Sequence, residues 1–182
     1  SLVSIDSGEP TISLTENDYT AVSITATVTD VNSCSDIATT TVKLYRSAVG
    51  SGCSDDGNDC YSATCSQDGG SCTGADDNTA TYTCSIDVAY YADPTDTGTY
   101  SAQNWIATLT SQDDAGLSAT STDTIEVATL LSVDITSSIN YGTLIPGGDA
   151  SSQATTTLTN TGNADVDIYI YGADMTCTSG SI

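Results

Sequence analysis

Residues 81–91 read TYTCSIDVAYY, and this stretch decides the fold class of the chain. Successive side chains of a β-strand point to opposite faces, so apolar residues at every second position predict a strand with one face buried. Most positions between the apolar ones carry Thr, Ser or Asp, which suits a face in water. The residues on the predicted inner face are Tyr82, Cys84, Ile86, Val88 and Tyr90.

The same alternation recurs on both sides of this stretch, and no segment of useful length has the period of a helix. In residues 38–46, for example, it places Ala38, Thr40, Val42 and Leu44 on one face. Seven or so short strands separated by turns favour an all-β, antiparallel sandwich. The other predicted strands lie at about residues 2–5, 11–14, 20–29, 104–110 and 125–127, with a turn at Asp113–Gly116.

A cysteine-rich insertion at about residues 48–79 separates two of these strands. The chain has seven cysteines and no C-x-x-C pair, which disfavours a zinc ribbon and favours disulfides. Disulfides indicate an oxidising compartment, so we expect an extracellular, secreted protein at the cell surface. The sequence leaves the pairing open. The disulfide candidates are Cys34, Cys53, Cys60, Cys65, Cys72 and Cys84, and Cys177 is expected to be unpaired or joined to another chain.

A second, smaller β-sandwich unit is predicted after the first. Residues 1–128 form the first unit, and alternation resumes in residues 129–182 with Leu131, Val133 and Ile135. Three or four strands are few for a closed sandwich, so this unit is either incomplete or completed by a neighbouring chain. The competing explanation is that its remaining strands lie beyond Ile182.

The charge of the chain excludes several classes of partner. It has 24 acidic side chains against Lys43 and Arg46, a net charge of −22. Such a charge repels nucleic acid and anionic lipid. No apolar run approaches the length of a membrane span, so we expect no membrane insertion.

Catalysis finds little support in the sequence. The chain has no histidine, which excludes the usual Ser-His-Asp and Cys-His sites, and no catalytic residue stands out. We therefore expect that the protein is not an enzyme.

Calcium is the one cofactor that the sequence suggests, because oxygen ligands cluster closely in one loop. The candidate ligands are Asp55, Asp56, Asn58 and Asp59, and hydrated surface carboxylates are the competing interpretation.

A contact surface between copies of the chain is predicted from its two ends. Tyr169 and Tyr171 lie opposite the apolar positions of their predicted strand, and tyrosine is enriched at interfaces. A strand from a neighbouring copy, with Leu2, Val3 and Ile5 as donor residues, would complete the second unit by β-strand addition. The partners are then other copies of the chain, and the many Ser and Thr residues allow covalent O-glycans.

Residues 104–119, NWIATLTSQDDAGLSA, resemble the last hairpin of bacterial Ig-like repeats in surface proteins, where W-x-A-x-V-T-x-x-D-x-A-G precedes the final strand. Residues 141–147 and 159–163 are similar to β-sandwich modules of secreted prokaryotic proteins. The resemblance implies an immunoglobulin-like sandwich of a bacterial or archaeal surface protein, with a structural or adhesive role. The cysteine-rich insertion departs from the usual pattern of these repeats.

These observations lead to one leading hypothesis and two alternatives. The leading one is a structural subunit of an extracellular filament or pilus-like fibre, assembled through β-strand exchange or β-sandwich contacts. The first alternative is an adhesin or surface-layer binding module of a larger protein. The second is a glycan-binding accessory domain of an enzyme.

Overall fold

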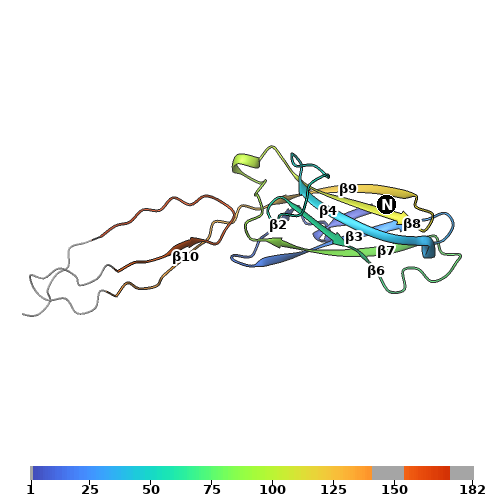
Figure 1. Cartoon of the computed structure of the whole chain (residues 1–182), viewed down its shortest axis with the longest axis horizontal. Helices are drawn as coiled ribbons and strands as arrows, with labels where there is room; N and C mark the ends of the chain where they lie inside the picture. The colour runs from blue at the N-terminus through green and yellow to red at the C-terminus, as the bar shows by residue number, and fades with distance from the viewer. Residues whose placement is uncertain (1, 141–153, 173–182) are drawn as a thin grey trace, which may run out of the picture.

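Two β-sheets lie face to face in the computed structural model, which describes residues 2–140 and 154–172, and a narrow tail extends from one end of them (Figure 1). The predicted all-β sandwich is confirmed. The helical segments among the described residues are three short 3-10 turns: η1 (Asp6–Gly8), η2 (Cys34–Asp36) and η3 (Gly98–Tyr100). In that part of the chain no helix is long and apolar enough to cross a membrane.

The first sheet contains the stretch that decided the fold class. Its strands are all antiparallel, and the longest pairing in it joins β3 to β7 along their whole lengths. The predicted inner positions of β7 are buried as far as Val88, and the strand ends at Ala89. In sheet order the strands are β1 (Leu2–Ile5), β3 (Tyr19–Thr29), β7 (Thr79–Ala89) and β6 (Ser66–Gln67).

The second sheet is antiparallel except where β2 pairs with β9 in parallel. The predicted turn at Asp113–Gly116 joins β8 to β9. There Gly116 has a φ of 86°, and the amide of Leu117 donates to Oδ1 of Asp113 at 2.7 Å. In sheet order the strands are β2 (Thr11–Ile12), β9 (Ser118–Val127), β8 (Trp105–Asp113), β4 (Ile37–Arg46) and β5 (Cys60–Thr64).

The core lies between the two sheets, with Trp105 fully buried near one end. The Trp105 indole N–H donates to the carbonyl of Asp93 at 3.0 Å, so this large side chain leaves no polar atom unsatisfied. The Tyr61 ring packs against it, with 5.8 Å between the ring centroids.

Two details of the strands differ from the sequence predictions. Ala38 is exposed and not inward, because the register between β4 and β8 shifts between Ile37 and Thr39. Alternation holds from Thr40 to Leu44, and the strand then ends with Tyr45 and Arg46 both buried. The insertion is not one long loop either. It supplies β5 to the second sheet and β6 to the first, so it is part of the sandwich.

Three disulfides pair the six candidate cysteines: Cys34–Cys72, Cys53–Cys60 and Cys65–Cys84. Cys65 stands where the chain crosses from β5 in one sheet to β6 in the other, and its bond to Cys84 in β7 anchors that crossing in the core. Two disulfides therefore tie the insertion to η2 and to β7, and the third closes a loop within it. Cys177 lies outside the described residues.

The tail contains a two-stranded antiparallel sheet, β10 (Val133–Ile135) and β11 (Leu158–Asn160). The sequence also predicts a strand with Val166, Ile168 and Ile170 on one face, but these residues form no strand in the structure. Residues 141–153 and 173–182 lie outside the described residues. A second sandwich in residues 129–182 therefore stays a prediction.

Candidate functional site

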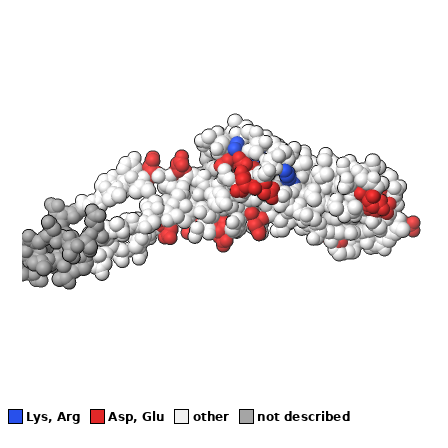
Figure 2. All heavy atoms as spheres, in the orientation of Figure 1, with Lys and Arg blue, Asp and Glu red and all other residues white. Residues whose placement is uncertain are grey.

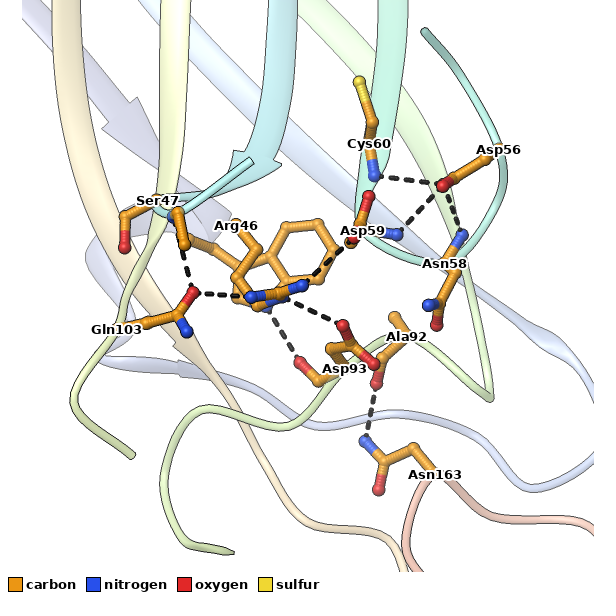
Figure 3. Close-up of polar contacts among 12 residues, drawn as sticks. Arg46, Ser47, Asp56, Asn58, Asp59, Cys60, Ala92, Asp93, Gln103 and Asn163 are labelled. Carbon is orange, nitrogen blue, oxygen red and sulfur yellow. Dashed lines mark hydrogen bonds and ion pairs between the residues drawn. The ribbon is translucent and has the colours of Figure 1, made fainter. Parts of the chain in front are cut away.

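The acidic loop, residues 55–59, is held in shape by hydrogen bonds from backbone amides to its own carboxylates. Oδ1 of Asp56 accepts hydrogen bonds from the amides of Asn58, Asp59 and Cys60 at 2.9, 3.0 and 3.3 Å (Figure 3). The bonds from Asn58 and Asp59 lower the pKa of Asp56. Oδ2 of Asp55 accepts from both the amide and the hydroxyl of Ser62. These two carboxylates therefore close the loop.

Arg46, at the end of β4, joins this loop to the rest of the sandwich. Its guanidinium contacts Asp59 at 3.1 Å and Asp93 at 2.9 Å, and it donates to Oε1 of Gln103 at 2.6 Å (Figure 3). It also lies 4.0 Å from the centre of the Tyr100 ring. Burial and the nearby charge of Asp56 raise the pKa of Asp59, and Arg46 partly offsets both.

The geometry does not support the predicted calcium site. Of its candidate ligands, Asp56 binds amides, Asp55 binds Ser62, and Asp59 is paired with Arg46. Among the residues that the structure describes, no three carboxylate or thiol side chains are grouped so as to hold a metal ion. The loop is better explained as a clamp that holds the insertion on the sandwich.

A polar joint attaches the tail to the sandwich; it consists of residues 128–132 and the turn at 160–163. The side-chain amide of Asn163 donates to the carbonyls of Ala92 and Ala128 at 2.9 and 3.0 Å, and its oxygen accepts from the amide of Leu130 at 2.7 Å. The amide of Asn163 donates to the carbonyl of Leu130, and that of Thr161 donates to the carbonyl of Ser132. Asn163 thus contacts segments about 35 and 70 residues away in the chain.

Gly162 permits the close approach in this joint. A Cβ at this position would lie 2.0 Å from the carbonyl oxygen of Leu130 and 2.9 Å from the amide nitrogen of Ser132. Both are backbone atoms, which cannot rotate away as a side chain can. Any other residue at Gly162 must therefore displace the turn from residues 130–132.

The tail carries eight of the thirteen large apolar side chains that are exposed among the described residues. Tyr169, Ile170 and Tyr171 are 77%, 90% and 89% exposed. Summed over all the exposed large apolar side chains of the tail, the exposed area is on the order of 1,000 Å², taking roughly 150–200 Å² for each whole side chain. The others are Leu131, Val133, Ile135, Ile139 and Ile168.

The predicted donor strand is occupied within its own chain. Residues Leu2–Ile5 form β1, which pairs with β3 so that Val3 lies opposite Ala26 and Ile5 opposite Ile24. Val3 and Ile5 are buried in the core. A donor role would require β1 to leave β3 of its own chain, so strand exchange through these residues stays a prediction.

No family model matches the chain, and a search of the curated proteins finds no significantly similar sequence. The resemblance to Ig-like repeats therefore stays a prediction from the residues that carry it.

A second surface, the pole pocket, lies at the end of the sandwich away from the tail. It is a hollow of about 270 Å³ between the end of β3 and the β8–β9 hairpin. Val31 and Leu117 at this pocket are 86% and 73% exposed. Sequence reasoning missed it because it combines residues 28–37 with residues 111–119, two regions that are far apart in the chain. The one signal was an apolar residue in each of two polar turns. Its other apolar lining residues are Val28, Ile37 and Ala119.

Threonines line the outer face of the second sheet. Thr41, Thr110 and Thr120 form one row across β4, β8 and β9, and Thr108 and Thr122 continue the next row beside Lys43. No carboxylate stands at these paired positions.

Figure 2, which shows one face of the molecule, has the acidic side chains in separate patches with the two basic ones beside the central patch. Covalent O-glycans stay a prediction, and the threonine hydroxyls of the second sheet are suited to carry them.

Proposed function

We propose that the protein is a structural subunit of an extracellular fibre, whose copies join through the tail. The observation that carries the proposal is the apolar surface of the tail, on the order of 1,000 Å² in a chain of net charge −22. A stable protein interface buries about 800 Å² on each partner, so the tail alone presents enough surface.

The sandwich suits a mechanical role. Its three disulfides fit a non-cytoplasmic protein, and two of them tie the insertion to η2 and β7. The strand order supports the immunoglobulin-like arrangement, in which strands A, B, E and D face strands C, F and G. In that arrangement β1, β3, β7 and β6 take the positions of A, B, E and D, and β4, β8 and β9 take those of C, F and G.

A non-catalytic role is supported by the polar groups of the described part. The carboxylates that the sequence grouped in one loop are engaged by amides, by Ser62 and by Arg46. The chain also has no histidine to serve as a general base near neutral pH.

Screening of charge is expected to control assembly. Two copies of charge −22 repel each other, while their tails attract through apolar contact. The Debye length falls from about 10 Å at 0.1 M salt to about 3 Å at 1 M. Fibres should therefore form more readily as salt increases, the reverse of an interface built from ion pairs.

Sedimentation velocity and negative-stain electron microscopy across a series of protein and salt concentrations test the proposal. We expect species that lengthen with concentration and with salt, seen as rows of sandwiches. A protein that stays monomeric at the highest protein and salt concentrations would overturn the proposal. It would favour instead a binding module whose tail is covered by another part of a longer chain.

A further inference from the structure

The two most exposed apolar surfaces of the molecule lie at opposite ends of the sandwich. β9 begins at Ser118, beside the pole pocket, and ends at Val127, where the joint to the tail begins. Its ten residues span roughly 33 Å at about 3.3 Å per residue. The β8–β9 turn beside the pocket and the tail therefore lie toward opposite ends of the long axis (Figure 1).

The chemistry of the pole pocket fits a tyrosine side chain. Its lining is mixed: apolar side chains such as Val28 and Ile37 form part of the wall, and the polar part includes Asp30 and Asp113. Oδ1 of Asp30 accepts from the amide of Asn32, and Oδ1 of Asp113 accepts from the amide of Leu117. Within the described part of the chain, the second oxygen of each carboxylate accepts no hydrogen bond. A tyrosine whose ring packs on the wall can thus donate a hydrogen bond from its hydroxyl group to one of these oxygens.

The tail offers two such tyrosines. Tyr169 and Tyr171 are two positions apart in a segment that forms no strand, and both are more exposed than any other tyrosine in the described part. Ile168 and Ile170 alternate with them and supply apolar contact beyond the pocket. At the pole pocket, the exposed side chains of Val31 and Leu117 extend the apolar surface that Ile168 and Ile170 would contact.

We propose that residues 168–171 of one copy dock at the pole pocket of the next copy, with one tyrosine ring seated in the pocket. This inference rests on the proposed fibre and names its contact. The two surfaces differ and face opposite ways, so the contact is head-to-tail and adds further copies without closing.

Two blocking variants test this contact, each altered at exposed positions. The pole variant is Leu117→Asp, and the tail variant carries Tyr169→Ser and Tyr171→Ser. Each keeps one surface intact, so at high salt each alone should be monomeric, while an equal mixture should form one-to-one dimers and nothing longer. Tyr19→Ser and Val49→Asp change exposed side chains away from both surfaces and should assemble like the wild type.

The readout is sedimentation velocity, and circular dichroism checks that each variant is folded. A pole variant that still dimerises or polymerises alone would overturn the head-to-tail contact and leave the proposed fibre standing. A mixture that stays monomeric would also overturn it. A wild-type protein that is monomeric in all conditions would overturn the fibre itself, so the two failures are distinguishable.

A second measurement is independent of variant stability. Leu117→Cys in one copy and Tyr169→Cys in another should form a disulfide-linked dimer when mixed under oxidation, with the new bond identified by mass spectrometry. Tyr19→Cys in place of Tyr169→Cys is the matched control and should not link. Equal linking of both pairs would contradict the assignment.

Discussion

Replacing Gly162 by alanine tests whether the tail is held by the joint. The added methyl group would lie 2.0 Å from the carbonyl oxygen of Leu130, which is about 1 Å closer than real Cβ contacts permit. The turn must therefore move away from residues 130–132. Gly172→Ala is the matched control, because a Cβ there meets no atom within 4 Å.

The cost follows from the hydrogen bonds that cross the moved contact. Asn163 donates its amide to the carbonyl of Leu130 and accepts from the Leu130 amide, and Thr161 donates to Ser132. Three such bonds contribute about 1 kcal/mol each, or about 3 kcal/mol in total. This corresponds to roughly a hundredfold change in the equilibrium between the closed and the open joint.

Hydrogen exchange measures this equilibrium directly. In Gly162→Ala the amides of Leu130, Thr161 and Asn163 should exchange about a hundredfold faster, while the amides of β3 and β7 keep their protection. Gly172→Ala should exchange like the wild type. Unchanged protection of the three amides in Gly162→Ala would refute the reasoning, because it would mean that the backbone accommodates the methyl group without opening.

Three further predictions concern the sandwich. Arg46→Met leaves the largely buried carboxylates of Asp59 and Asp93 without their cation and should lower the free energy of unfolding by about 3–5 kcal/mol in urea titrations; adding Asp59→Asn and Asp93→Asn should restore most of it. Burial raises the pKa of Asp96, but hydrogen bonds from the Thr129 hydroxyl and amide outweigh it and leave the pKa below its ordinary value of 3.8. The stability that Asp96 contributes is thus present above pH 3.8 and lost as the pH falls through the lower folded-state value; Asp96→Asn should flatten the acid limb of stability against pH, and an unchanged limb would contradict this. Replacing Cys65 and Cys84 by alanine should lower the free energy of unfolding by about 3 kcal/mol or more, because this disulfide lies in the core and closes a longer loop than Cys53–Cys60 does. Replacing Cys53 and Cys60 by alanine should lower it by about 2.5 kcal/mol. Calorimetry of both variants measures the two losses, and a larger loss for the Cys53–Cys60 variant would contradict this prediction.

Local sequence pattern was sufficient for the long strands. The alternation in residues 20–29, 81–91 and 104–110 corresponds to β3, β7 and β8, because each of these strands has one face on the core and one in water. The turn at Asp113–Gly116 was equally readable, since glycine and aspartate have specific roles in turns.

Strands whose burial is set by neighbours were not predicted. In β5 the consecutive residues Cys60 and Tyr61 are both buried, which breaks the period of two. The reason is tertiary: Cys60 is bonded to Cys53, and the Tyr61 ring reaches Trp105. The clamp around Arg46 was missed for the same reason, because its partners Asp59, Asp93 and Gln103 come from three segments.

The joint and the contact at the tip of the tail are linked through the order of the tail. A two-stranded sheet such as β10–β11 is marginal by itself in water, so the joint is what holds the tail at the sandwich. If the joint opens, tail residues that it holds in place become disordered, and docking of residues 168–171 must order them again. The backbone entropy lost in doing so costs about 1–2 kcal/mol for each residue. Freeing even two or three residues would weaken the contact roughly a hundredfold or more. Gly162→Ala should therefore shift fibre formation to much higher protein concentration although Gly162 lies outside the contact, and Gly172→Ala should not. If Gly162→Ala exchanges faster at the joint yet assembles like the wild type, the tail is not the element that joins the copies.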